Sequence, residues 1–87
     1  MNNTEGQEKD KTVEIVVNAR PRTVAKDKLS YRYVVELAYG QFDPNPNVVY
    51  TVTYSKGIHD EKGSLVDGKD VMAHKGMVFH VTKTDKS

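Results

Sequence analysis

The sequence predicts an α+β domain in which one helix packs across one face of a mixed sheet of four or five strands. Three observations lead to this expectation. Segments rich in β-branched residues precede and follow a single amphipathic segment with helical spacing. The chain has 87 residues, which is enough for one small domain. A lone helix has no second helix to pack on, so it must cover a sheet.

The N-terminal part divides into a polar tail and a first strand. Residues 1–11 carry no periodicity and are interpreted as a flexible tail, because they cannot bury enough apolar surface to offset the entropy of ordering. The next segment, 12–17, is rich in β-branched residues that alternate at Val13, Ile15 and Val17. This alternation predicts a strand with one face in the core.

A turn and a second strand are expected to follow. The turn lies at Asn18-Ala19-Arg20, since asparagine tolerates a positive φ angle. The chain can then return over residues 21–26. Pro21 lacks an N–H group, so this strand should begin at the proline or lie at an edge of the sheet.

The helix is expected from Ser30 to about Tyr39. The Ser30 hydroxyl can cap the first turn, and Leu29 is positioned to form a hydrophobic staple with Val34. Gly40 can end the helix in the left-handed conformation. The apolar residues with helical spacing are Val34, Leu37 and Ala38, with Tyr31 and Val35 beside them.

The C-terminal half alternates between strands and polar connections. Val48, Tyr50, Val52 and Tyr54 share one face of the clearest strand in the chain. The expected order is a loop at 43–47, a strand at 48–55, a polar loop at 57–63, a short strand at 64–66, a connection at 69–76 and a final strand at 77–82.

This order of elements fits a β-grasp if the final strand lies parallel to the first and beside it. The proline-bearing strand then falls at an edge, as its chemistry requires. The predicted domain covers residues 12–83, and residues 84–87 form an exposed C-terminal tail. The predicted core consists of Ile15, Val34, Leu37, Val52, Phe79 and Val81.

Composition argues against several classes of protein. Thirteen basic residues against twelve acidic ones give a net charge of +1, which disfavours a nucleic-acid partner. No apolar run is long enough to span a bilayer, and the N-terminus lacks the apolar region of a signal peptide. The absence of cysteine fits a reducing cytoplasm. We therefore expect a cytoplasmic protein without membrane contact.

No catalytic or metal-binding pattern is recognisable. The sequence has no Ser/His/Asp arrangement, phosphate loop or paired buried carboxylates, so no enzyme activity and no cofactor are expected. His59, Asp60, Glu61 and His74 match no known ligand spacing, and we expect no metal site. The five tyrosines are interpreted as core and rim residues rather than as a ligand-binding box.

An ordered set of motifs runs through the chain, at residues 17–24, 29–31, 34–35, 37–38, 49–57, 63–68, 76–82 and 84–87. With this set, the chain from residue 13 to the C-terminus resembles the bacterial multiubiquitin-domain family. Two positions depart from the family pattern. Ala19 stands where the turn usually has glycine, which favours another turn type because a positive φ is costly for alanine. Tyr33 stands where an acidic residue usually completes the capping box.

The resemblance implies a protein modifier with a ubiquitin-like fold. Members of the family are encoded beside E1-like and E2-like proteins and a peptidase. The expected partners are therefore an E1-like activating enzyme, an E2-like carrier, a processing peptidase and protein targets. A role in phage defence is one expectation from related bacterial systems.

The conjugation tail implied by this resemblance is Thr84, Asp85, Lys86 and Ser87. These residues lack the Gly-Gly pair of ubiquitin, whose small size suits a narrow channel. Either the machinery works without Gly-Gly, or the tail is trimmed first, or the domain is not conjugated. An ordinary solvated terminus is the simplest interpretation of these residues taken alone.

The expected partner-binding face consists of Val49, Thr51, His80 and Thr82. His80 and Thr82 should point outward from the final strand, and the outward residues of the long strand share that face. This face of ubiquitin-like sheets commonly binds partners, although a solvated strand face explains the same residues. Two other functions remain open: a β-grasp interaction module that is not conjugated, and a sulfur carrier, which the missing Gly-Gly disfavours.

Overall fold

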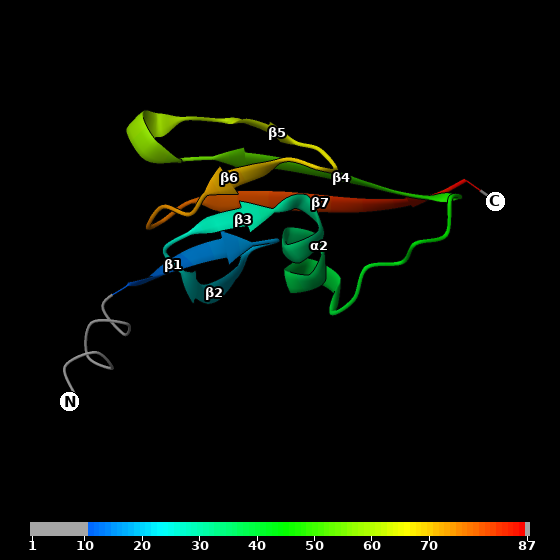
Figure 1. Ribbon diagram of the computed structural model, residues 1–87, viewed down its shortest axis with the longest axis horizontal. Helices are drawn as coiled ribbons and strands as arrows, with labels where there is room; N and C mark the ends of the chain where they lie inside the picture. Colours follow the sequence, from blue (N-terminus) through cyan, green and yellow to red (C-terminus); the bar gives the residue numbers. More distant parts are fainter. Residues whose placement is uncertain (1–10, 87) are drawn as a thin grey trace.

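One α-helix packs across a mixed five-stranded sheet, which confirms the predicted β-grasp (Figure 1). The computed structural model describes residues 11–86. The predicted N-terminal tail lies almost wholly outside this range. In chain order the elements are β1 (Thr12–Val17), β2 (Arg20–Ala25), β3 (Lys28–Ser30), α2 (Tyr31–Tyr39), β4 (Val48–Ser55), the 3₁₀ turn η1 (Ile58–Asp60), β5 (Gly63–Leu65), β6 (Asp70–Met72) and β7 (Val78–Asp85).

The strand order of the large sheet is β2-β1-β7-β4-β5. β7 lies beside β1 in parallel, with Val16 opposite Val78, as the sequence predicts. The other neighbours in this sheet are antiparallel. β2 is an edge strand, so the missing N–H of Pro21 can be accommodated.

The turn between β1 and β2 differs from the expected type. Asn18 and Ala19 both have positive φ angles, of 51° and 69°, as in a type I′ hairpin. The side chain of Asn18 explains why the turn keeps this form. Its Nδ2 donates to the carbonyl of Val81 over 3.0 Å, and its Oδ1 accepts from the N–H of Val81 over 2.8 Å. The carboxamide therefore extends the β1–β7 pairing beyond Val17, and the strain at Ala19 is tolerated.

Replacing Ala19 with glycine should stabilise the domain. Alanine in the left-handed region costs on the order of 1 kcal/mol, whereas glycine adopts this region freely. Ala19 is exposed, so the substitution removes little packing. We expect Ala19→Gly to raise the free energy of unfolding by about 1 kcal/mol in urea titrations.

Ala25→Gly is the matched control for this turn substitution. Ala25 is also exposed, but it lies in β2 and does not have a positive φ. Glycine there should lower stability by about 0.5–1 kcal/mol, because it loses more backbone entropy on folding. Equal destabilisation by both substitutions would show that the turn is not strained.

The helix begins and ends as predicted. The Ser30 hydroxyl accepts a hydrogen bond from the N–H of Tyr33 over 3.1 Å, and Gly40 has a φ of 84°. Its buried side differs from the expected one. Val34 and Val35 are fully buried, whereas Leu37 is only partly buried. The prediction that Leu37 is a core residue is therefore wrong, because it lies near the end of a nine-residue helix, at the rim of the core.

A second, two-stranded sheet was not predicted. β3 pairs with β6, with Leu29 opposite Val71. The segment 69–76, expected to be a connection, thus contains a strand. Three residues are too few to display a period of two, so only the tertiary pairing reveals these strands. Leu29 and Ala73 from this region are buried and enlarge the core.

The core lies between the helix and the inner face of the large sheet. Five of the six predicted core residues, all except Leu37, are buried. Phe79 is completely buried in β7, the central strand. α2 has nine residues, and no helix within residues 11–86 could cross a membrane. The fully enclosed large side chains are Phe79, Ile15, Met77, Val17, Val34, Val35 and Val52.

Candidate functional site

The face of the large sheet opposite the helix brings the predicted partner-binding residues together. Thr51 of β4 lies directly opposite Thr82 of β7. His80 lies opposite Thr53, and Val49 lies opposite Thr84. Side chains directly opposite each other in an antiparallel pair share one face and contact each other. The four predicted residues are all exposed and lie on this face of the sheet, which we call the outer face.

The outer face carries little charge. The ladders place fifteen residues on it, and Glu14 is the one acidic or basic side chain among them, histidine aside. In a chain with 29% charged residues, this makes the outer face distinct from the rest of the surface. Low charge is typical of the centre of a protein interface. The outer-face residues are Thr12, Glu14, Val16, Pro21, Thr23, Ala25, Val49, Thr51, Thr53, Ser55, Ser64, Val78, His80, Thr82 and Thr84.

The predicted conjugation tail begins inside β7. The sequence pattern places the end of the strand near Thr82, but β7 continues to Asp85. Thr84 pairs with Val49, and Asp85 pairs with Val48. The N–H of Lys86 then donates to the carbonyl of Asn47 over 2.7 Å. The side chains of these tail residues are exposed, as expected, but their backbone is paired with the start of β4.

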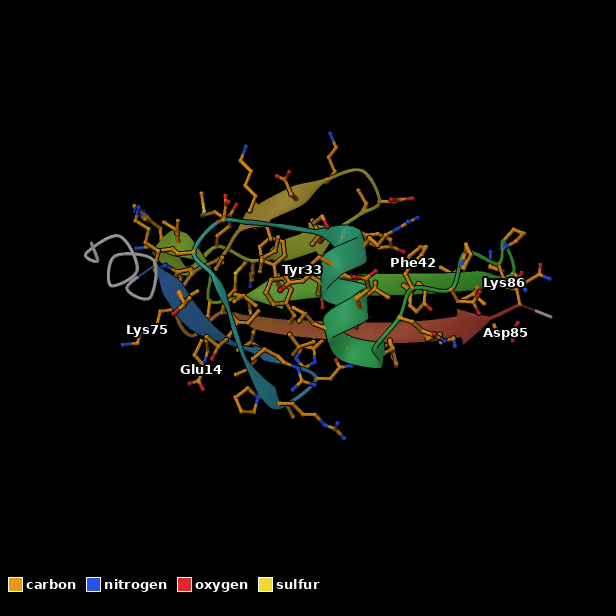
Figure 2. All side chains as sticks on the ribbon, turned by 60° about the horizontal axis from the view of Figure 1, so that its bottom comes forward. Glu14, Tyr33, Phe42, Lys75, Asp85 and Lys86 are labelled. Carbon is orange, nitrogen blue, oxygen red and sulfur yellow. The ribbon has the colours of Figure 1, made fainter. Side chains whose placement is uncertain are left out.

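This end of the sheet projects beyond the helix. Figure 2 shows Asp85 and Lys86 at the tip of the β4–β7 ribbon, away from α2. None of the helices in the described part of the chain lies over this tip, so the strand needs no apolar residues there to pair with its neighbour. The apolar alternation therefore stops before the strand does, which is why the sequence pattern placed its end too early. Ser87 lies outside the described residues.

An aromatic cluster packs between the helix and β4. The ring of Phe42 lies 5.2 Å from that of Tyr50 and 6.1 Å from that of Tyr31, measured between centroids. The Arg32 guanidinium lies 4.3 Å above Phe42, within cation–π range. Tyr50 is buried, whereas Tyr39 is exposed and its ring lies 5.9 Å from Tyr50. Tyr50 thus occupies a core position and Tyr39 a position at the rim.

A cavity of about 260 Å³ opens beside this cluster. The hydroxyl of Tyr31 donates to the carbonyl of Tyr50 over 3.1 Å at its wall. Burial raises the pKa of Tyr31, and the negative charge of Asp67 raises this pKa further. No sequence pattern indicates the cavity, because its walls come from three separated segments. The lining residues are Tyr31, Tyr50, Thr51, Val52, Ser64, Leu65, Val66 and Asp67.

A comparison with known protein families matches residues 13–85 to the multiubiquitin family. The chain belongs to the multiubiquitin family. No curated protein and no solved structure matches it. The matched range of this multiubiquitin domain begins in β1 and ends at Asp85, the last residue of β7. Thr84 and Asp85, predicted as tail, are therefore within the region matched by the family.

Val81 is the last residue of β7 in the multiubiquitin domain that hydrogen-bonds to the β1 side of the sheet. Its carbonyl accepts from Asn18 Nδ2 and from the Tyr39 hydroxyl, each over 3.0 Å. β1 ends at Val17, so within the described residues β4 is the one strand that pairs with β7 beyond Val81. Beyond Val81, β7 is consequently paired on one side, with β4, and this part of the strand lies next to the outer face.

The residues weighed as metal ligands do not gather in the multiubiquitin domain. His59 and Asp60 are exposed in η1, and His74 lies after β6. Within residues 11–86 no three acidic or histidine side chains form a group that could hold a metal ion. The candidate site therefore consists of the outer face and the C-terminal end of β7.

Proposed function

We propose that this multiubiquitin domain is a bacterial protein modifier that acts in the cytoplasm. An E1-like enzyme would activate its C-terminal segment, and an E2-like carrier would transfer it to target proteins, with a peptidase trimming the tail where needed. The observation that carries this proposal is membership of the multiubiquitin family over residues 13–85, in a β-grasp whose last strand ends at an exposed tip. The domain itself would be the transferred group, not an enzyme, and would need no cofactor.

Activation requires a carboxylate that can reach an enzyme's active site. ATP adenylates such a carboxylate and releases pyrophosphate, and a side chain of the carrier can then attack the acyl-adenylate and displace AMP. The tail proposed for this step is Thr84–Ser87. Because Thr84 and Asp85 pair with Val49 and Val48, the tip must open before it can enter a channel.

Opening the tip should cost little free energy. The side chains of Thr84, Asp85 and Lys86 are exposed, so separating them from β4 uncovers little apolar surface. A hydrogen bond contributes on the order of 1 kcal/mol net when water can replace it. Docking of the activating enzyme on the adjacent outer face can supply free energy of this size. Val49 links the two regions, since it belongs to the outer face and pairs with Thr84 of the tail.

A charge placed on the outer face should weaken this docking. Thr82 is exposed, lies opposite Thr51 within the predicted partner-binding residues, and does not line the cavity. We expect Thr82→Arg to reduce binding of the E1-like partner at least about tenfold, because an arginine would be buried in the interface without a partner for its charge. Binding can be measured by biolayer interferometry with the immobilised domain.

Gln41→Arg provides the matched control for charge. Gln41 is exposed in the segment after the helix and is not part of the outer face. The substitution therefore adds the same positive charge at a different place on the surface. This variant should bind as the parent does. If the two variants bind equally well, the outer face does not contact the activating enzyme.

The function itself is tested by reconstitution with the E1-like and E2-like partners and ATP. Adducts that appear as a ladder on denaturing gels, with branched peptides ending in tail residues by mass spectrometry, would support conjugation. The second candidate is an interaction module that is never conjugated, which the paired backbone of Thr84 and Asp85 favours. That module would bind partners reversibly and give no covalent adduct under the same conditions.

A further inference from the structure

The cavity beside the aromatic cluster lies at an open edge of β4. β5 pairs with β4 only from Val52 to Tyr54, whereas β4 begins at Val48. The cavity lies next to the stretch that β5 leaves uncovered, with the first turn of the helix on the other side. A segment of another protein can therefore approach this edge without displacing a strand of the domain.

The walls of the cavity have an apolar part and an acidic part. Val52 and Leu65 form an apolar base, and Val66 is 54% exposed at the rim. Asp67 provides the one charged side chain among the lining residues, and no basic residue lines the cavity. The negative charge of Asp67 acts on the wall of the cavity, since it contributes to the raised pKa of Tyr31.

The size of the cavity suits a single side chain. Sites for small molecules usually enclose about 300–1,000 Å³. At about 260 Å³ the cavity falls below that range. A long side chain with an apolar stem and a positive end matches both the size and the walls, since lysine and arginine pack their stems on apolar surface and keep their charge at a polar end.

We propose that this cavity binds a basic side chain from an extended segment of a partner protein lying along the open edge of β4. The aliphatic stem would pack on Val52, Leu65 and Val66, and the cationic group would contact the carboxylate of Asp67. The Tyr31 hydroxyl donates to Tyr50, so an oxygen lone pair of Tyr31 can accept from the same cation. This site is separate from the tail and does not depend on conjugation.

A pair of peptides tests the chemistry of the occupant. The probe is acetyl-Val-Thr-Lys-Thr-Val-amide, and its control carries norleucine in place of lysine, which keeps the stem but removes the charge. Both are titrated into the full ¹⁵N-labelled chain and followed by two-dimensional NMR. The lysine peptide should shift the amides of Tyr31, Leu65, Val66 and Asp67. The norleucine peptide should bind at least about fivefold more weakly.

Two variants test whether the carboxylate of Asp67 binds the cationic group of the peptide. Asp67→Asn keeps a residue suited to the turn before Gly68 but removes the carboxylate, and should weaken the lysine peptide at least about fivefold. Asp70→Asn makes the same charge change at an exposed residue of β6 outside the cavity, and should leave binding unchanged. The proposal is overturned if norleucine binds as well as lysine, if both variants behave alike, or if none of the four amides shifts.

Discussion

A chain ending at Lys83 should remain folded but form no covalent adducts. The deletion removes Thr84, Asp85 and the residues after them, which is the segment proposed to enter the activating enzyme. Thr84 and Asp85 pair with the start of β4, and the N–H of Lys86 donates to the carbonyl of Asn47. The side chains of Thr84, Asp85 and Lys86 are exposed. We expect the free energy of unfolding to fall by on the order of 1 kcal/mol. Typical domains have about 5–15 kcal/mol, so the fold should persist.

The measurement combines thermal unfolding with reconstitution in the presence of the E1-like and E2-like partners. A variant of full length with both charges reversed, Asp85→Lys with Lys86→Asp, separates the length of the tail from its chemistry. This variant keeps the strand positions but should be activated more slowly if the enzyme contacts those charges. Adducts formed as efficiently by the chain ending at Lys83 would show that residues 84–87 are not the reactive segment.

Phe79→Ala should remove most of the stability of the domain. Phe79 is completely buried in the central strand, and its ring lies 6.1 Å from that of Tyr54. Truncation of a buried phenylalanine costs about 3–5 kcal/mol, from lost burial and from the cavity left behind. In a domain of 87 residues this is a large part of the total. Urea titrations followed by circular dichroism measure the loss.

The neighbouring residue provides the control for this core substitution. His80 follows Phe79 in β7 but points to the outer face and is exposed. His80→Ala should change the free energy of unfolding by no more than about 0.5 kcal/mol. A loss of less than about 1 kcal/mol for Phe79→Ala would mean that the core lies elsewhere.

The candidate site was predicted in part. The alternation of β4 and β7 correctly places Val49, Thr51, His80 and Thr82 on one face, because side-chain direction follows from position in a strand. The same alternation misplaces the end of β7, since apolar residues stop where the helix no longer covers the sheet. The cavity could not be predicted, because its walls meet only after the helix, β4 and β5 pack together.

The sequence by itself determined the features that depend on neighbouring residues. Ser30 and Gly40 fixed the ends of the helix through hydrogen bonding and backbone freedom, and Pro21 required an edge position. Tertiary structure decided the features that depend on distant residues. The backbone of Val81 hydrogen-bonds to the side chain of Asn18 and thereby stabilises the strained turn at Ala19. β3 and β6 become strands only because they pair with each other across 40 residues or more. Local preferences cannot encode these contacts, since each requires a partner that folding alone brings near.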